Sequence, residues 1–137
     1  MKVLLSLLIL CAYINAITFR TCLNNPSVTV ASIETNPKTI IRGNELTVSV
    51  NGNSGVEITR GKVIASASMY SVEIIRQEEQ LCDHTTCPIR RGDFSVSQTI
   101  DIPVDAFPGF YTLKFQLYNE TNVEISCTTF KVQIKSS

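Results

Sequence analysis

The chain has 137 residues, which is enough for one domain. Its twelve basic and twelve acidic side chains cancel to a formal net charge of zero. Proteins that bind nucleic acid present a strongly basic face to the phosphate backbone, so this balance of charge argues against a nucleic-acid partner.

The first sixteen residues have the pattern of a secretory signal peptide. Lys2 supplies a positive charge, Val3–Cys11 is almost entirely apolar, and Ala16 places a small residue at the cleavage point. The apolar stretch is too short to span a bilayer. We therefore expect a signal peptide over residues 1–16 and one mature domain over residues 17–137. Such a chain is secreted or delivered to the endosomal or lysosomal lumen.

Four cysteines remain in the mature part, at Cys22, Cys82, Cys87 and Cys127. Four cysteines allow three disulfide connectivities. Chain spacing favours the one in which Cys82 and Cys87 close a small loop, which leaves Cys22 to pair with Cys127. A structural zinc site uses closely spaced ligand pairs, and Cys22 and Cys127 have no such neighbour. Disulfides therefore explain the cysteines better than a metal does.

In the first half, short stretches rich in β-branched residues predict strands. We expect strands over Ser27–Thr35, Glu45–Val50 and Val56–Thr59. Asn51–Gly55 contains two glycines and is expected to be a flexible connector. Val63–Tyr70 is apolar but consists largely of small residues. This stretch either leaves space between two sheets or packs closely against a bulky neighbour.

The alternation of apolar and polar residues is sharper in the second half. After a polar loop over Gln77–Gln80, strands are expected over Phe94–Ile102, Phe110–Asn119 and Glu124–Ile134. No stretch has the period of a long amphipathic helix. The pattern predicts an all-β fold, an antiparallel β-sandwich of about seven strands. The second of these strands carries its apolar side chains on one face, and they are Tyr111, Leu113, Phe115 and Leu117.

Signals of catalysis are weak in this sequence. His84 is the only histidine, and it lies beside Asp83 in the loop between Cys82 and Cys87. A catalytic triad assembles a nucleophile, a base and an acid in space, and neighbours in one tight loop seldom do so. A metal site needs more ligands than one histidine supplies. We therefore predict that the protein is not an enzyme and has no catalytic residue, no metal site and no cofactor.

Two tripeptides stand out on the expected surface. Asn119-Glu120-Thr121 is an N-glycosylation sequon at an expected hairpin tip, so Asn119 is a candidate for glycosylation. Arg91-Gly92-Asp93 has the sequence that integrins recognise. Three residues match easily by chance, and a glycine turn into the following strand is the favoured interpretation of this second tripeptide.

Motifs along the whole mature chain are similar to those of one family. The matching residues are Cys22, Cys82-x4-Cys87-Pro88-Ile89, Arg90-Arg91-Gly92-Asp93-Phe94-Ser95, Ile102-Pro103-Val104, Phe107-Pro108-Gly109, Tyr111-Thr112-Leu113-Lys114, Leu117-Tyr118-Asn119, Cys127 and Phe130-Lys131-Val132. The chain resembles the ML domain family (MD-2-related lipid recognition). Within that family it is most similar to the phosphatidylglycerol/phosphatidylinositol transfer proteins and to the Niemann–Pick type C2-like proteins.

The resemblance implies an immunoglobulin-like β-sandwich with an apolar cavity between its sheets. It implies the same disulfide pairing that chain spacing favours. The sterol-binding members carry an additional cysteine pair in the first half, which this chain lacks. That departure argues against close equivalence to a sterol carrier.

Lipid binding and intermembrane lipid transfer are the functions that the resemblance implies, with phosphatidylglycerol or phosphatidylinositol as the expected lipid. By similarity, Val104 and Phe107 match positions that line the cavity or its mouth, and Ile74 matches one less closely. Four further side chains either line the cavity or form ordinary core, namely Tyr111, Leu113, Phe115 and Leu117.

The expected partners are a phospholipid or sterol ligand and, transiently, a membrane surface, which the protein meets as a monomer. Arg90 and Arg91 either meet an anionic head group or lie in a solvated turn. Two alternatives stay open. One is sterol binding and transport on the same fold. The other is a secreted recognition or adhesion module that uses Arg91-Gly92-Asp93 or presents a lipid to a receptor.

Overall fold

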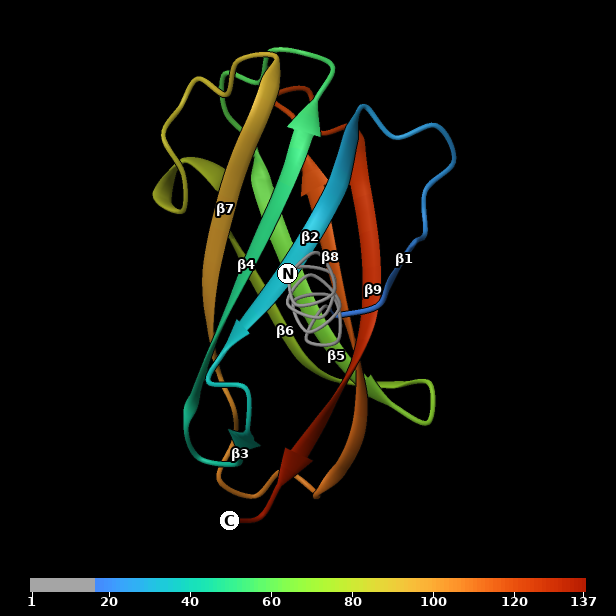
Figure 1. Ribbon diagram of the computed structural model, residues 1–137, viewed down its shortest axis with the longest axis vertical. Coiled ribbons are helices and arrows are strands. Elements are labelled where there is room, and N and C mark those ends of the chain that lie inside the picture. The colour runs from blue at the N-terminus through green and yellow to red at the C-terminus, as the bar shows by residue number, and fades with distance from the viewer. Residues whose placement is uncertain (1–16) are drawn as a thin grey trace, which may run out of the picture.

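The computed structural model describes residues 17–137, so the predicted signal peptide lies outside the described residues. Figure 1 shows two layers of strands packed face to face. The strands are β1 (Phe19–Thr21), β2 (Val28–Asn36), β3 (Ile40–Ile41), β4 (Glu45–Ser54), β5 (Lys62–Met69), β6 (Val72–Gln80), β7 (Gly92–Asp101), β8 (Gly109–Tyr118) and β9 (Glu124–Lys135). One 3₁₀ turn, Leu81–Asp83, follows β6. Within residues 17–137 no helix is long and apolar enough to cross a membrane.

One sheet has the strand order β2-β4-β7, and the other has the order β1-β9-β8-β5-β6 with β3 added on β9. All pairings are antiparallel except that of β3 with β9. Seven strands are long, and β1 and β3 have only three and two residues. The prediction of an all-β, immunoglobulin-like antiparallel sandwich of about seven strands is confirmed.

The core lies between the two sheets because alternate residues of each strand point inward. In β4 the inward residues Leu46, Val48 and Val50 are buried. They face β8, whose inward residues are buried as well. Full burial of an aliphatic or aromatic side chain contributes about 1.5–3 kcal/mol, so these two strands supply much of the hydrophobic stabilisation.

The expected connector over Asn51–Gly55 is wrong, because β4 continues through Ser54. This stretch forms ladder hydrogen bonds with β2 on one side and β7 on the other, and the two ladders outweigh the low strand propensity of its residues. At position 52 only glycine fits, because there is no space for a side chain. A Cβ atom at this position would lie 2.4 Å from the carbonyl oxygen of Thr29.

Two further expectations, for Val56–Thr59 and Gln77–Gln80, are corrected. Val56–Thr59 is not a strand, since only Ile58 forms a bridge, with Ile89. Gln77–Gln80 is not a loop but the end of β6, which pairs with β5 at the edge of its sheet. An edge strand packs on fewer neighbours, so it accommodates polar side chains that the alternation argument assigned to solvent.

Candidate functional site

A small cavity lies between the two sheets. Its volume is about 20 Å³. A cavity of this size holds about one water molecule, whereas sites for small organic ligands measure roughly 300–1,000 Å³. Most of its wall is aliphatic or aromatic. The lining residues are Val30, Val48, Val50, Val63, Val96, Gln98, Phe115, Leu117, Ser126 and Thr128.

The cavity is small because side chains from both sheets fill the interior. The rings of Phe115 on β8 and Phe130 on β9 stack with their centroids 5.9 Å apart. Ala65 and Ala67 on β5 are buried against the same core. Of the two interpretations of Val63–Tyr70, close packing against bulky neighbours is therefore the one that the structure supports. A lipid chain enters this space only if the sheets or their side chains move apart.

Three polar side chains interrupt the apolar lining. Gln98 on β7 is 1% exposed, and Ser126 and Thr128 on β9 are also buried. Among the described residues, neither the Nε2 nor the Oε1 atom of Gln98 has a hydrogen-bond partner. The sequence analysis did not single out Gln98. The signal was present, because Gln98 lies between Val96 and Ile100 in the apolar phase of its strand.

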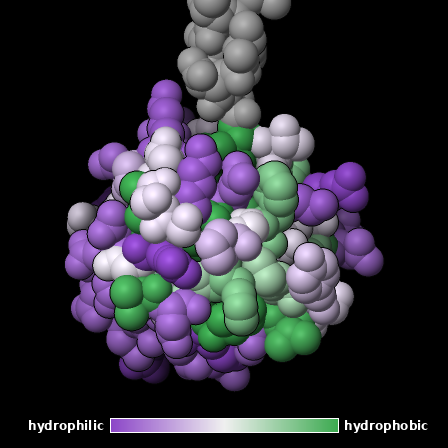
Figure 2. All heavy atoms as spheres, turned by 90° about the horizontal axis from the view of Figure 1, so that it is seen from below, coloured by the Kyte–Doolittle hydropathy of each residue, from purple (hydrophilic) through white to green (hydrophobic). Residues whose placement is uncertain are grey.

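One end of the sandwich exposes large apolar side chains. Val104 and Phe107, in the loop between β7 and β8, are 77% and 74% exposed, and Phe110 at the start of β8 is 67% exposed. Figure 2 shows hydrophobic side chains grouped on this end and bordered by hydrophilic ones. We call this surface the apolar tip. It consists of Tyr70, Val72, Ile74, Val104, Phe107 and Phe110.

The loops of the apolar tip are held by contacts to the strands below them. The hydroxyl of Tyr111 donates to the carbonyl oxygen of Phe107 at 2.6 Å. Burial raises the pKa of this hydroxyl, so it stays protonated and able to donate at neutral pH. A Cβ atom at Gly43 would lie 3.6 Å from Cγ2 and 3.7 Å from Cα of Val104, so the turn at Gly43 is within ordinary van der Waals distance of this loop. The tip therefore has defined loop positions and carries exposed apolar side chains.

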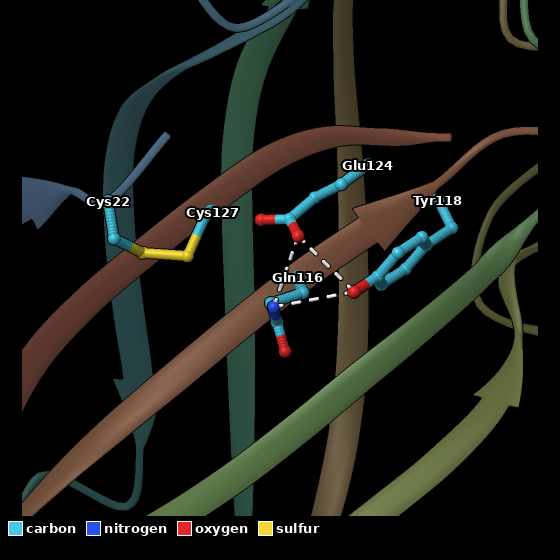
Figure 3. Close-up of a disulfide and its surroundings, with 5 residues drawn as sticks. All are labelled: Cys22, Gln116, Tyr118, Glu124 and Cys127. Atoms are coloured by element: carbon cyan, nitrogen blue, oxygen red, sulfur yellow. Dashed lines mark hydrogen bonds between the residues drawn. A yellow bond between two sulfur atoms is a disulfide. The ribbon is translucent and has the colours of Figure 1, made fainter. Parts of the chain in front are cut away.

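The opposite end of the sandwich is cross-linked and polar. Cys82 and Cys87 form one disulfide, with their Cα atoms 5.5 Å apart. Cys22 and Cys127 form the other, with their Cα atoms 5.0 Å apart (Figure 3). These are the pairs that chain spacing favours. The hairpin between β8 and β9 also lies at this end, where Asn119 Oδ1 accepts from the backbone N–H groups of Thr121 and Val123.

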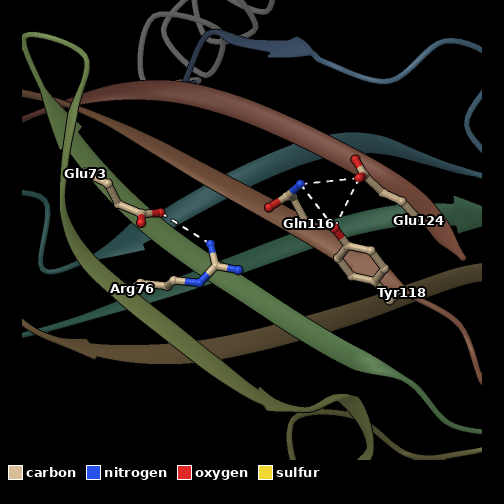
Figure 4. Close-up of polar contacts among 5 residues, drawn as sticks. All are labelled: Glu73, Arg76, Gln116, Tyr118 and Glu124. Carbon is tan, nitrogen blue, oxygen red and sulfur yellow. Dashed lines mark hydrogen bonds and ion pairs between the residues drawn. The ribbon is translucent and has the colours of Figure 1, made fainter. Parts of the chain in front are cut away.

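A polar cluster lies on the outer face of the larger sheet (Figures 3 and 4). Gln116 Nε2 donates to Glu124 Oε2 at 3.3 Å, and the Tyr118 hydroxyl donates to the same oxygen at 3.2 Å. Burial, followed by the charge of Glu124, raises the pKa of Tyr118. Farther along the sheet, Glu73 pairs with Arg76 at 3.4 Å. The contacts to Glu124 join the neighbouring strands β8 and β9, whereas the Glu73–Arg76 pair lies within β6. Both lie on the outer face of the sheet, away from the interior cavity.

His84 pairs with Glu79 at the cross-linked end. Within residues 17–137 no group of three or more His, Cys, Asp and Glu side chains is arranged to hold a metal ion. Asp93 of β7 pairs with Asn53 of β4, and Asn53 Nδ2 donates a hydrogen bond to Asp93 Oδ1 at 3.2 Å. The Arg91-Gly92-Asp93 tripeptide therefore runs into the β7 ladder and does not stand at the tip of a free loop.

The structure divides the predicted lipid-binding residues into two groups. Ile74, Val104 and Phe107 are exposed at the apolar tip. The other four are buried on the inner face of β8, where Phe115 and Leu117 line the cavity and Tyr111 reaches toward the tip. Sequence analysis missed Tyr70, Val72 and Phe110, because nothing local marks a residue of an alternating strand or a turn as exposed. The buried group on β8 consists of Tyr111, Leu113, Phe115 and Leu117.

Comparison with known proteins identifies the family of this chain. A family model described as the ML domain matches residues 16–134. The chain belongs to the ML domain family. It is 32% identical over 117 residues to a Dictyostelium discoideum protein provisionally named phosphatidylglycerol/phosphatidylinositol transfer protein 1. That match covers 82% of this chain and 77% of the relative.

Two solved structures share the fold of this ML domain. A Niemann–Pick type C2 protein from the Japanese carpenter ant has a TM-score of 0.70 at 18% identity, covering 86% of this chain and 99% of that one. Chicken MD-1 complexed with lipid IVa has a TM-score of 0.57 at 13% identity, covering 85% of this chain and 97% of that one. At these identities the similarity establishes the fold alone.

Proposed function

We propose that this ML domain binds one phospholipid between its sheets and transfers it between membranes, and that the lipid is phosphatidylglycerol or phosphatidylinositol. The observation that carries the proposal is the apolar tip, which lies at one end of the space between the two sheets. The name of the Dictyostelium relative and the lipid in the MD-1 complex support it. The disulfides favour a site of action outside the cell or in an endosomal or lysosomal lumen.

Physical chemistry explains why a carrier of this kind needs no catalytic group. Each CH₂ group of a lipid chain has a free energy about 0.8 kcal/mol higher in water than in an apolar environment. An interior lined by Val, Leu and Phe removes that cost when the sheets separate to admit the chain. Exposed apolar side chains at one end of the sandwich favour contact with a membrane, and this contact places the interior next to the donor bilayer.

With a cavity of about 20 Å³, the structure corresponds to a closed carrier without lipid, and such a closed form is compatible with this role. An apolar interior that stayed wide open in water would be costly, so the empty carrier closes on itself. Opening at the membrane exchanges contacts between side chains for contacts with lipid. The energetic cost of separation is therefore offset only when a lipid is available.

The test is transfer of a fluorescent phospholipid from donor to acceptor vesicles by the oxidised protein, followed by native mass spectrometry of the recovered protein. Transfer that rises with protein concentration, together with a one-to-one phosphatidylglycerol or phosphatidylinositol adduct, is the expected result. A sterol adduct alone would assign the protein to sterol transport. Uptake of neither class from vesicles, with cell adhesion that is lost in Asp93→Glu, would replace the proposal by an adhesion role.

A further inference from the structure

Gln98 is a buried polar group that the proposed function, as stated, does not use. It is 1% exposed, and its amide lines the cavity between the sheets. No described residue offers either amide atom a hydrogen bond. Burying an amide without partners lowers stability, so an apolar residue of similar size would stabilise the empty protein better. The position is therefore better explained by a ligand than by packing.

Two further polar side chains line the cavity with Gln98. On its own sheet, Gln98 pairs with Val48 of β4 and is flanked on the inner face by Val96 and Ile100. Ser126 and Thr128 contribute hydroxyl-bearing side chains to the wall formed by the other sheet. The volume of about 20 Å³ suffices for one water molecule, which meets only part of the hydrogen-bonding capacity of the amide while the cavity is closed. A ligand oxygen that replaces such a water must match its hydrogen bonds, or affinity is lost.

The position of Gln98 along β7 indicates which ligand oxygen this is. Asp101 ends β7 on the side of the apolar tip, three residues beyond Gln98. At roughly 3.3 Å per residue, the amide lies about 10 Å below the end of the strand. A phospholipid whose head group stays at the tip carries its acyl-ester carbonyl oxygens just below that head group, and its remaining chain is apolar. The ester carbonyls are the hydrogen-bonding groups attached directly to the acyl chains, so they are the groups that such a lipid brings between the sheets together with its chains.

We infer that Gln98 selects lipids with ester-linked chains, by donating a hydrogen bond from Nε2 to an ester carbonyl oxygen inside the cavity. This inference rests on the proposed function, since it presumes that a phospholipid enters between the sheets. An ether-linked lipid with the same head group and chains lacks the carbonyl, and its ether oxygen is a weaker acceptor. It leaves the amide unpaired. One hydrogen bond of ordinary strength corresponds to about a 3- to 10-fold preference for the ester lipid.

The experiment offers the oxidised protein vesicles that contain equal amounts of dioleoyl phosphatidylglycerol and its dialkyl ether analogue. Native mass spectrometry then gives the ratio of the two adducts, and thermal unfolding gives Tm. We expect a ratio of about 3–10 for the wild type and close to 1 for Gln98→Met, whose Tm is equal or higher. Gln80→Met, the same change at an exposed position of β6, keeps the ratio of the wild type.

Each of the other outcomes overturns the inference. A ratio near 1 in the wild type, with both lipids bound, removes the selectivity and leaves the proposed function standing. An unchanged ratio in Gln98→Met, or a Tm several degrees lower, assigns Gln98 a structural role. Uptake of neither lipid by the wild type overturns the proposed function, and the inference falls with it.

Discussion

The two ends of the sandwich are both made of connecting loops, but their side chains differ in kind. At one end, the loop between β7 and β8 and the hairpin between β5 and β6 expose the apolar tip. At the other end, the disulfide Cys82–Cys87 and the hairpin at Asn119 present a cross-linked, largely polar surface. Val123 is the large apolar side chain exposed at that second end, at 54%.

This difference separates two requirements of a small carrier. A chain of this size has a limited core, and disulfides that restrict the unfolded chain stabilise the whole fold. The other end is then free to expose apolar side chains, which contribute nothing to the core. The cross-links and the membrane-contact surface thus lie toward opposite ends of one pair of sheets. Substitutions at the two ends test that division.

Removing the disulfide Cys22–Cys127 by replacing both cysteines with alanine should have the largest effect. This bond closes a loop with a sequence separation of 105 residues, and its loss is expected to cost about 4–5 kcal/mol in the free energy of unfolding. The five-residue separation of Cys82–Cys87 predicts a smaller loss, about 2 kcal/mol. Urea denaturation of the two double variants measures both. Equal losses would contradict the account of chain restriction.

Two residues of β8 contrast the interior with the tip. Leu113 is 1% exposed, so Leu113→Ala should lower the free energy of unfolding by about 2–5 kcal/mol through lost burial and a new cavity. Phe110→Ser, three residues earlier at the tip, should change it by less than about 0.5 kcal/mol. Thermal or urea unfolding measures both variants. A large loss for Phe110→Ser would show that the tip packs as core.

Charges placed at the two ends should have opposite consequences for membrane contact. Phe107→Asp introduces a carboxylate into the apolar tip and should weaken binding to anionic vesicles by about 10-fold or more. The reason is that a Phe side chain transferred from water into the membrane contributes about 1.5–3 kcal/mol to binding. Val123→Asp makes a comparable change at the cross-linked end and should leave vesicle binding unaltered. Co-sedimentation with phosphatidylglycerol vesicles measures both. Equal weakening would remove the tip from the mechanism.

The smallest effect concerns the anchor of the tip loop. Tyr111→Phe removes the hydroxyl that donates to the carbonyl oxygen of Phe107, and should lower the free energy of unfolding by about 1 kcal/mol. Hydrogen exchange in residues 103–108 should become faster, because the loop loses a contact to β8. Tyr118→Phe, on the outer face of the same strand, serves as the control. Exchange that is unchanged in Tyr111→Phe would show that other contacts hold the loop.

The strands of the second half could be predicted within about two residues, because their alternation is strict. β7, β8 and β9 lie where the pattern of apolar residues places them, and the inner face of β8 is buried as expected. The first half was less predictable. Asn51–Gly55 and Gln77–Gln80 have poor strand propensity and are nonetheless strands, because hydrogen bonds to neighbouring strands decide their conformation.

The sequence by itself determined the class of fold, the cysteines that pair and the family of the protein. These depend on local alternation and on motifs that can be recognised without knowledge of the distances between residues in the folded chain. Only the tertiary structure decided the size of the cavity, the gathering of the tip and the isolation of Gln98. The cavity volume depends on how side chains from strands far apart in the chain fill the space between the sheets. The same holds for the tip, since Tyr70 and Phe110 line one surface only when β5 and β8 pair.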